Sequence, residues 1–226
     1  MKGVFVTGTD TGVGKTLVAA SLVRAFAASG LAAVGMKPVA SGAVAGPGGA
    51  PMWEDVVALQ EAANVQAPLE WVNPYRFMPP VAPHLAATDA GVTIDLEHVV
   101  EACGHLAELA DVVVVEGVGG FLVPFNERES AADMACRLGL PVVLVVGMRL
   151  GCINHALLTA EAVRARGLQL AGWVANVIDP AMARFDDNLN ALRARLPAPL
   201  LGVIPWQGRP DPEATAASLK IQSLHL

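Results

Sequence analysis

A glycine-rich segment near the amino terminus constrains the fold more strongly than any other feature of the sequence. Gly8-Thr9-Asp10-Thr11-Gly12-Val13-Gly14-Lys15-Thr16 follows the apolar run Val4-Phe5-Val6 and precedes an alanine-rich stretch that predicts a helix over residues 15–29. A strand, a glycine loop and a helix in this order are typical of a phosphate-binding loop, because backbone N–H groups converge on phosphate oxygens and the helix N-terminus adds positive potential. We therefore expect Lys15 to reach the β- and γ-phosphates of a nucleotide and the Thr16 hydroxyl to ligate Mg²⁺.

The spacing of this loop is unusual. Five residues, instead of the usual four, separate Gly8 from Gly14. Thr9 or Thr11 must then tolerate the turn that a further glycine normally makes. The alternative is a glycine-rich turn in which the Lys-Thr pair is incidental, but the strand before it and the helix after it favour a phosphate-binding loop.

Apolar, β-branched runs alternate with helix-length segments along the rest of the chain. Strands are expected at residues 33–37, 112–115, 142–146, 170–176 and 200–204, and helices at 52–63, 96–109, 130–138, 154–166 and 181–196. Residues 43–51 predict a mobile loop, and residues 73–83, with four prolines, an irregular segment. This alternation predicts a single α/β domain over residues 1–226, with one parallel sheet and helices on both faces. Ligands of such a sheet bind at the carboxyl ends of its strands, and the motifs of this chain all fall at such ends.

The composition excludes several classes of protein. A formal net charge of −6 argues against nucleic acid as a partner. The apolar stretches are shorter than the ~20 residues that a membrane span requires, and no basic, then apolar leader pattern opens the chain, so a cytoplasmic protein is expected. The three cysteines, Cys103, Cys136 and Cys152, show no metal-ligand spacing, which predicts reduced, buried thiols.

Two carboxylates and a second lysine are further candidate site residues. Glu116 ends the 112–115 valine run and precedes Gly117-Val118-Gly119-Gly120, so it lies at a strand end beside the glycine loop. Asp55 begins a helix and is either a Mg²⁺ ligand or a helix-capping carboxylate. Lys37 ends the second strand and is either a surface residue or a group that neutralises a transferring phosphoryl group.

These residues belong to several short sequence blocks, which follow one another along nearly the whole chain. They are Thr7-Gly8-Thr9-Asp10-Thr11, Gly14-Lys15-Thr16, Lys37-Pro38-Val39-Ala40-Ser41-Gly42, Val72-Asn73-Pro74-Tyr75, Glu116-Gly117-Val118-Gly119-Gly120, Leu150-Gly151-Cys152-Ile153-Asn154-His155, Ala171-Gly172-Trp173-Val174-Ala175-Asn176 and Ile204-Pro205-Trp206. With them the chain resembles the dethiobiotin synthetases, which have a P-loop NTPase fold. The resemblance implies a homodimeric ligase of biotin biosynthesis that uses ATP, Mg²⁺ and CO₂ to close a cyclic urea on 7,8-diaminononanoate. A substrate amine would add CO₂, the carbamate oxygen would attack the γ-phosphoryl group, and the second amine would close the ring.

The same resemblance implies roles for individual residues. Lys15 and Lys37 would hold phosphate and carbamate charge, and Thr11 and Ser41 would contact the carbamate or diamine end. Thr16, Asp55 and Glu116 would surround Mg²⁺. The ATP site would comprise Gly12, Val13, Gly14, Lys15, Thr16, Leu17, Asp55, Glu116, Gly117, Val118, Gly119, Asn176, Pro205, Trp206, Gln207 and Glu213. Besides Ser41, the substrate site would include Gly151, Cys152, Ile153 and Asn154, which open a helix whose N–H groups would bind the substrate carboxylate across the dimer interface.

Three residues depart from the family pattern. Gly12 stands where some members have an acidic residue, which leaves an amine contact there open. Val177 follows Asn176 where an aspartate is frequent, and Gln207 changes the residue after Pro205-Trp206. None of the three is among the expected metal or phosphate groups.

Two alternatives share the predicted architecture. A ParA/MinD-like dimeric ATPase switch would carry a lysine at the position of Asp10 and often a basic or amphipathic tail, whereas residues 218–226 include one lysine. An amide ligase acting on a large corrin-like acid usually carries an added glutaminase domain, for which this chain has no room. Both fit the sequence less well than a dethiobiotin synthetase-like enzyme.

Overall fold

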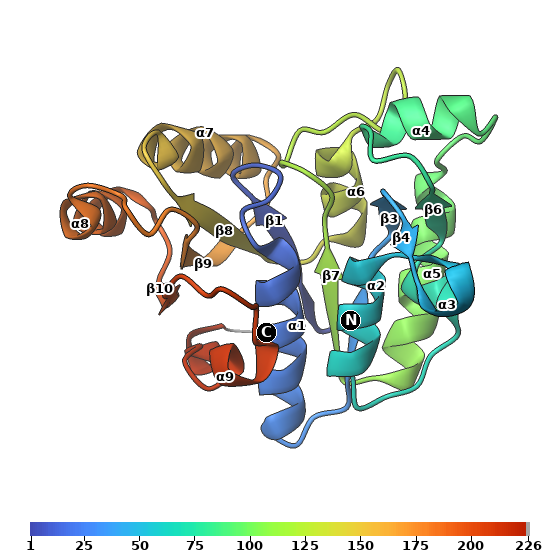
Figure 1. Cartoon of the computed structure of the whole chain (residues 1–226), viewed down its shortest axis with the longest axis horizontal. Coiled ribbons are helices and arrows are strands. Elements are labelled where there is room, and N and C mark those ends of the chain that lie inside the picture. Colours follow the sequence, from blue (N-terminus) through green and yellow to red (C-terminus); the bar gives the residue numbers. More distant parts are fainter. Residues whose placement is uncertain (225–226) are drawn as a thin grey trace.

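A six-stranded parallel sheet forms the centre of the molecule, in the order β10-β9-β8-β1-β7-β2 (Figure 1). The computed structural model describes residues 1–224. The strands of this sheet are β1 (Gly3–Gly8), β2 (Ala33–Met36), β7 (Val112–Glu116), β8 (Val142–Met148), β9 (Leu170–Val177) and β10 (Leu200–Ile204). The parallel α/β architecture predicted from the sequence is confirmed.

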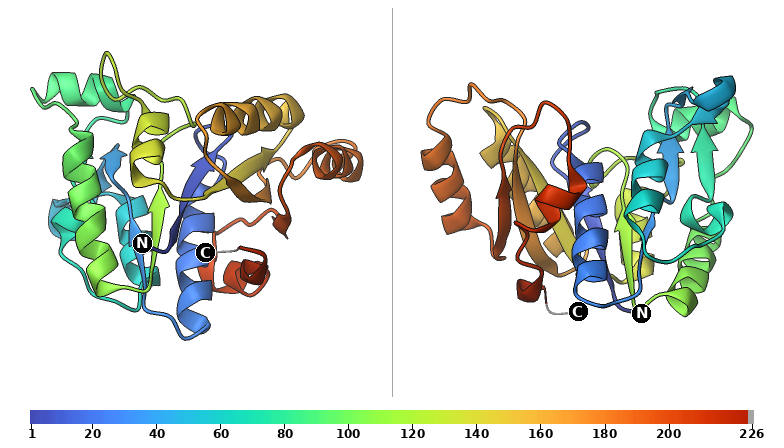
Figure 2. Two further views of the ribbon diagram at one scale, coloured as in Figure 1. Left: turned by 180° about the vertical axis from the view of Figure 1, so that it is seen from behind. Right: turned by 60° about the horizontal axis from the view of Figure 1, so that its bottom comes forward.

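Helices cover both faces of the sheet, as Figures 1 and 2 show from opposite sides. One face carries α1 (Lys15–Ala28), α2 (Glu54–Ala62) and α9 (Pro212–Ala216). The other carries α5 (Leu96–Leu109), α6 (Ala131–Leu138), α7 (Cys152–Ala165) and α8 (Phe185–Arg195). The short helix α3 (Leu69–Val72) contacts α5, and α4 (Pro83–Asp89) contacts the small strands β3 (Val39–Ser41) and β6 (Tyr75–Phe77). Within residues 1–224, none of the helices combines the length and apolarity needed to cross a bilayer.

The strands read as continuous apolar runs because both faces of the sheet are buried. In β1, Val4 and Val6 pack with α1, whereas Phe5 points to the opposite face and packs with α5 and α6. Alternate valines of β7 divide in the same way between the two clusters. The parallel strand order places the carboxyl ends of β1, β7 and β2 side by side, and the loops that follow them meet at one edge of the sheet (Figure 1).

Two segments of the structure differ from the sequence-based expectation. A loop is expected over residues 43–51, but they contain β4 (Val44–Ala45), which pairs with β5 (Pro51–Met52) across a short 3₁₀ turn at Pro47–Gly49. An irregular segment is expected over residues 73–83, but β6 forms there and pairs in parallel with β3. In both places glycines and prolines predict irregular backbone, but pairing with another segment forms a strand. Local sequence does not show which segment will lie beside it.

The cysteines are free thiols, but one of them is not buried. Cys103 and Cys152 are buried, whereas Cys136 is exposed, so the expectation of three buried thiols is wrong for Cys136. The apolar face of α6 is made by residues such as Ala132 and Ala135, and Cys136 falls on the solvent side of that helix. Burial raises the pKa of the Cys103 thiol to about 12.

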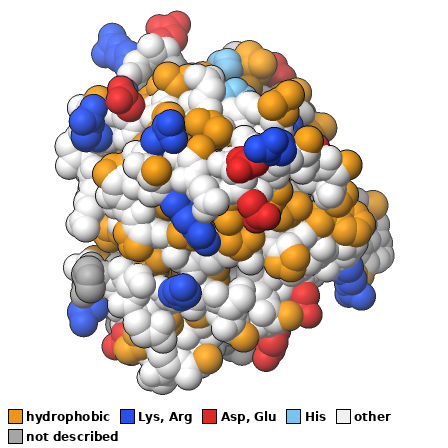
Figure 3. All heavy atoms as spheres, turned by 90° about the vertical axis from the view of Figure 1, so that its left-hand side faces the viewer, with side chains coloured by type: hydrophobic (Ala, Val, Ile, Leu, Met, Phe, Trp, Pro, Cys, Tyr) orange, Lys and Arg blue, Asp and Glu red, His pale blue; other side chains and the backbone are white. Residues whose placement is uncertain are grey.

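Apolar side chains reach the surface near the carboxyl ends of the strands. Leu150, just before α7, is 91% exposed, and Leu158 within α7 is 61% exposed. Three more apolar residues are exposed: Met78 precedes α4, Leu85 lies within α4, and Leu122 follows β7. On the molecular face seen in Figure 3, hydrophobic side chains are interspersed with basic and acidic ones. This face therefore combines apolar area with charges of both signs.

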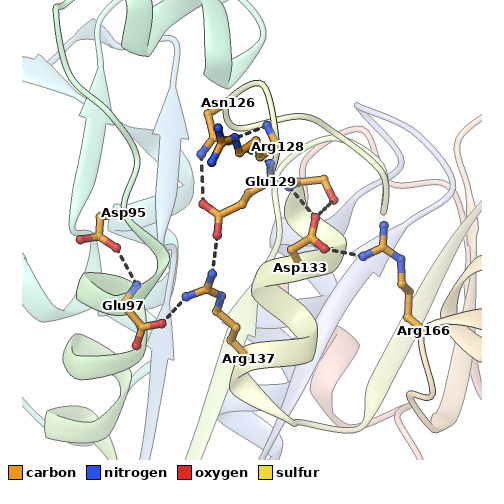
Figure 4. Close-up of polar contacts among 9 residues, drawn as sticks. Asp95, Glu97, Asn126, Arg128, Glu129, Asp133, Arg137 and Arg166 are labelled. Atoms are coloured by element: carbon orange, nitrogen blue, oxygen red, sulfur yellow. Dashed lines mark hydrogen bonds and ion pairs between the residues drawn. The ribbon is translucent and has the colours of Figure 1, made fainter.

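A polar network ties α6 to both of its neighbours (Figure 4). At the start of α6, Asp133 accepts hydrogen bonds from the backbone N and the hydroxyl of Ser130 at 2.8 and 2.6 Å, and it pairs with Arg166 at the end of α7. Arg137 of the same helix pairs with Glu97 of α5 and with Glu129. Burial alone would raise the pKa of Asp133, but the Ser130 hydrogen bonds and Arg166 outweigh it and lower the pKa below its ordinary value.

We predict that Asp133→Ala lowers the free energy of unfolding by about 1 kcal/mol at neutral pH, the typical value of a lost helix cap. Because the folded-state pKa of Asp133 is lowered, its contribution is present above the ordinary aspartate pKa and is lost as pH falls through the folded-state value. Urea unfolding at neutral pH and at about pH 3 should therefore show a difference from wild type that shrinks in acid. Glu101→Ala, at an exposed carboxylate of α5, is the matched control, and an equal loss in both variants would contradict the assignment.

Candidate nucleotide-binding site

A cleft of about 630 Å³ lies at the carboxyl ends of β1, β2 and β7. Four groups of residues line it: the glycine loop after β1, charged and polar groups at the ends of strands and the start of α2, the loop after β7, and an apolar wall at the start of α4. The lining residues are Thr11, Gly12, Gly14, Lys15, Thr16, Lys37, Ser41, Asp55, Pro80, Val81, Ala82, Pro83, Glu116, Val118, Gly119 and Val123. Residues predicted from widely separated motifs are thus brought to one place.

The glycine loop reaches its conformation through Gly12 and Gly14. These two residues have φ values of 73° and 89°, in the left-handed region that favours glycine. The expectation that Thr9 or Thr11 takes this role is wrong, since neither has a positive φ. A side chain at Gly14 would meet the Asn176 amide at 2.2 Å, and that amide donates to the Val13 carbonyl at 2.9 Å. Asn176, at the end of β9, therefore fixes the back of the loop.

Asp10 braces the front of the loop through each of its oxygens. One carboxylate oxygen accepts a hydrogen bond from the Thr11 N–H at 2.8 Å, and the other accepts one from Arg149 at 2.6 Å. The Asp10 carbonyl accepts a hydrogen bond from the Lys15 ammonium at 2.9 Å. Arg149 directly follows β8, the strand next to β1, so this ion pair joins the glycine loop to the segment that leads into α7.

Lys15 is 7% exposed at the start of α1. Burial, followed by repulsion from Lys37, lowers the pKa of its ammonium to about 8. An anion bound in the cleft would offset both effects, because an opposite charge nearby favours the protonated form of a lysine. The loop is therefore electrostatically suited to phosphate.

Lys37 and Glu116 form a buried ion pair at the centre of the site. The Lys37 ammonium lies 2.7 Å from Glu116 Oε1 and 3.0 Å from Asp55 Oδ2, and it donates to the Gly117 carbonyl at 3.2 Å. Lys37 and Glu116 are 4% and 1% exposed. Burial disfavours the charged lysine, but the two carboxylates outweigh it and raise the pKa of Lys37 above its ordinary value. Of the two roles left open for Lys37, a surface position is excluded.

The oxygen atoms around Glu116 suit a divalent cation. Thr16 Oγ1 donates to Glu116 Oε1 at 2.8 Å, whereas Glu116 Oε2 is buried with no hydrogen-bond partner among the described residues. Asp55 lies on the other side of Lys37. Within residues 1–224 the acidic, histidine and cysteine side chains form no group of three that would hold a metal unaided. Mg²⁺ is typically held by one or two carboxylates together with phosphate oxygens and water, so this donor set fits Mg²⁺ bound to a nucleotide.

The other predicted residues divide by position. Thr11, Gly12, Ser41, Val118 and Gly119 line the cleft. Val13 and Leu17 bury their side chains in the core beneath α1, which leaves their backbone for any ligand contact. The residues Gly117, Gly151, Cys152, Ile153, Asn154, Asn176, Pro205, Trp206, Gln207 and Glu213 are not among the lining residues.

Of the residues that follow β10, Gln207 bonds to α9 and its N-cap, and Glu213 lies within α9. Gln207 donates to Thr215 at 3.2 Å and accepts from the Asp211 N–H at 2.9 Å, while the neighbouring Trp206 is 54% exposed. Glu213 pairs with Arg24 of α1 at 3.1 Å. Gly151, with φ 95°, is the N-cap of α7.

Sequence reasoning does not find the pairing of Asp10 with Arg149. In the sequence, Asp10 belongs to a family block and marks the position of a lysine in another class, and Arg149 follows the apolar run that forms β8, but nothing local relates the two residues. The order of β8 and β1 in the sheet brings the two together, and that order is not written in local sequence.

We predict that Arg149→Ala weakens the binding of MgADP about two- to fivefold, the range expected from an exposed ion pair worth up to ~1 kcal/mol. Isothermal titration calorimetry measures the effect. Arg149→Lys should restore most of the affinity, because a cation then faces Asp10 again. Arg164→Ala, at an exposed ion pair further along α7, should leave the affinity unchanged. Unaltered binding in Arg149→Ala would show that the pair does not brace the loop.

The chain is similar to proteins of known family over almost its whole length. A family model described as an AAA domain matches residues 2–214. The ATP-dependent dethiobiotin synthetase BioD of Nitrosospira multiformis is 55% identical over 97% of this chain and 95% of its own length. Those of Aromatoleum aromaticum and Xanthomonas oryzae pv. oryzae are 55% and 52% identical, each over 96% of both chains.

Solved structures of P-loop ATPases share the fold at low sequence identity. The septum site-determining protein MinD of Pyrococcus horikoshii superposes with a TM-score of 0.56 at 16% identity, covering 98% of this chain and 88% of that one. A ParA family ATPase from Chlorobium tepidum gives a TM-score of 0.58 at 13% identity over all of both chains. These confirm the predicted P-loop NTPase fold, while the sequence relatives are far closer. The chain therefore belongs to the ATP-dependent dethiobiotin synthetase family.

Proposed function

We propose that this protein closes the ureido ring of dethiobiotin from 7,8-diaminononanoate and CO₂, with conversion of ATP to ADP and phosphate. The observation that carries the proposal is the convergence of Lys15, Lys37, Asp55 and Glu116 on one cleft, in a chain 52–55% identical to dethiobiotin synthetases. ATP use also follows from the P-loop. With this reaction, the protein is a ligase of biotin biosynthesis.

In this reaction the protein positions charged groups and needs no side-chain nucleophile. One substrate amine adds CO₂ to form a carbamate, and the carbamate oxygen attacks the γ-phosphoryl group, displacing ADP. The second amine then attacks the carbonyl carbon, and phosphate leaves with the carbamate oxygen. Phosphoryl transfer of this kind depends on positioning and electrostatic stabilisation, which the two buried lysines supply.

Mg²⁺ would be held by Thr16, Asp55 and Glu116, and it would supply neutralisation of phosphate charge. Lys15 would bind the β- and γ-phosphates from its place at the start of α1. Lys37 lies across the cleft, where it would hold the transferring group and the carbamate. Asn176, Pro205, Trp206 and Gln207 would flank the adenine, with Glu213 farther along the same segment.

The diamine would occupy the part of the cleft between the glycine loop and the segment before α4. Thr11 and Ser41 supply polar groups there, and Pro80, Val81 and Val123 supply apolar surface for the methylene chain. Gly12, which departs from the family pattern, leaves this end of the cleft open. A Cβ atom at that position would have no heavy atom within 4 Å apart from those of the residue itself and its chain neighbours.

We further propose a homodimer that completes each substrate site. The residues Gly151, Cys152, Ile153 and Asn154 open α7 with backbone N–H groups that suit a carboxylate, yet they do not line the cleft of their own chain. Leu150 and Leu158, at the start of α7 and within it, are exposed apolar residues of the kind found at interfaces between subunits. A second copy would therefore bring its α7 N-terminus to the carboxylate end of the substrate.

The proposed function predicts ADP release that requires both 7,8-diaminononanoate and bicarbonate. A coupled assay measures ADP, and mass spectrometry should find a product heavier than the diamine by CO₂ less water. Lys15→Gln is the control for contaminating ATPase and should abolish the signal. ADP release that is indifferent to diamine and bicarbonate would overturn the proposal and leave only an ATPase.

A further inference from the structure

The ammonium of Lys37 contacts one oxygen of each carboxylate that a divalent cation would use, while Glu116 Oε2 has no partner among the described residues. The ammonium lies 2.7 Å from Glu116 Oε1 and 3.0 Å from Asp55 Oδ2, and both of these carboxylates are the acidic groups of the proposed Mg²⁺ site. Thr16, the third proposed ligand, already donates its hydroxyl proton to the same Glu116 oxygen. Two cations are thus directed at the same two carboxylates.

The formal charges around the cleft sum to zero. Lys15 and Lys37 contribute two positive charges, and Asp55 and Glu116 contribute two negative ones. The nearby pair of Asp10 and Arg149 is balanced by itself. A bare Mg²⁺ ion would leave the cleft with a charge of +2 in a largely buried setting, which costs free energy. A nucleotide triphosphate with its metal would instead bring a net negative charge, against which both lysines are favourably placed.

The two lysines differ in what they touch. Lys37 contacts both carboxylates, whereas Lys15 donates to the Asp10 carbonyl. Removing either positive charge changes the net charge of the cleft equally, but only the loss of Lys37 frees Glu116 Oε1 and Asp55 Oδ2 from an ammonium. This difference separates an effect of contact from an effect of local charge.

From these contacts we infer that Lys37 is the built-in counter-ion of the metal site, so that a divalent cation enters with the nucleotide and not ahead of it. This inference rests on the proposed function, in which Asp55 and Glu116 hold Mg²⁺. When the metal and the triphosphate arrive together, the ammonium of Lys37 is released from the carboxylates toward the anionic groups of the substrates. Lys37, which is already charged in its ion pairs, therefore reaches the reacting groups only after the metal and nucleotide have entered, which gives this residue a positioning role toward the metal in addition to its role toward substrate.

Binding of Mn²⁺ alone, without nucleotide, diamine or bicarbonate, tests the inference. Electron paramagnetic resonance measures free Mn²⁺ during titration of the full chain. Wild type is expected to bind weakly, with a Kd of about 1 mM or above, equivalent to ~4 kcal/mol or less. Lys37→Gln is expected to bind at least about tenfold more tightly, because its carboxylates lose their counter-ion. Mn²⁺ should also raise the melting temperature of Lys37→Gln more than that of wild type.

Lys15→Gln is the matched control, with the same change in charge and a smaller expected gain in Mn²⁺ affinity. Equal gains in the two variants would overturn the inference in favour of local charge alone, and no gain in Lys37→Gln would overturn it outright. Should Lys37→Gln fail to fold, wild type still provides a test, because a Kd for Mn²⁺ clearly below about 1 mM would contradict a counter-ion role. Since no substrate is present, these outcomes are independent of whether the ligase assay succeeds.

Discussion

The buried contact of Lys37 with Glu116 and Asp55 joins three distant parts of the chain. Lys37 follows β2, Glu116 ends β7, and Asp55 lies in the first turn of α2. Taking Lys37 away would leave the Glu116 carboxylate buried without its partner, which typically costs about 3–5 kcal/mol. The ion pairs of Lys37 therefore both neutralise the buried charges and hold the parts of the site together. Thr16, which follows the glycine loop, joins this group because its hydroxyl donates a hydrogen bond to Glu116.

The parallel sheet makes that contact possible. The strand order places β7 between β1 and β2, so residues that are 100 positions apart, such as Thr16 and Glu116, meet at one edge. The same arrangement occurs in MinD and ParA ATPases, whose likeness to this chain extends to the fold. The difference lies in the loop: Asp10 stands where a switch ATPase of that type would carry a lysine, and here it pairs with Arg149.

Much of the fold is predictable because its signals are local. The predicted bounds of the helix Leu96–Leu109 and the strand Leu200–Ile204 match the structure to the residue. The helix has a periodic apolar pattern that begins after the N-cap Asp95, and the strand is an apolar run between two prolines. Elements that depend on pairing are not predictable in this way: β6 and the β4–β5 hairpin form against neighbours that local sequence does not name. For Lys37, sequence cannot decide between surface and site because a strand end alone does not reveal burial, whereas the pairing of Asp10 with Arg149 requires the strand order.

The transfer of oxygen from CO₂ to phosphate is the most direct test of the proposed chemistry. When the carbamate oxygen attacks the γ-phosphoryl group, its bond to carbon must break as the ring closes. A single turnover with ¹⁸O-labelled CO₂, quenched before the label exchanges with water, should therefore place one ¹⁸O atom in the released phosphate and one in the ureido carbonyl. Phosphate free of label, alongside normal formation of dethiobiotin, would contradict that route and require ATP to act on a different group.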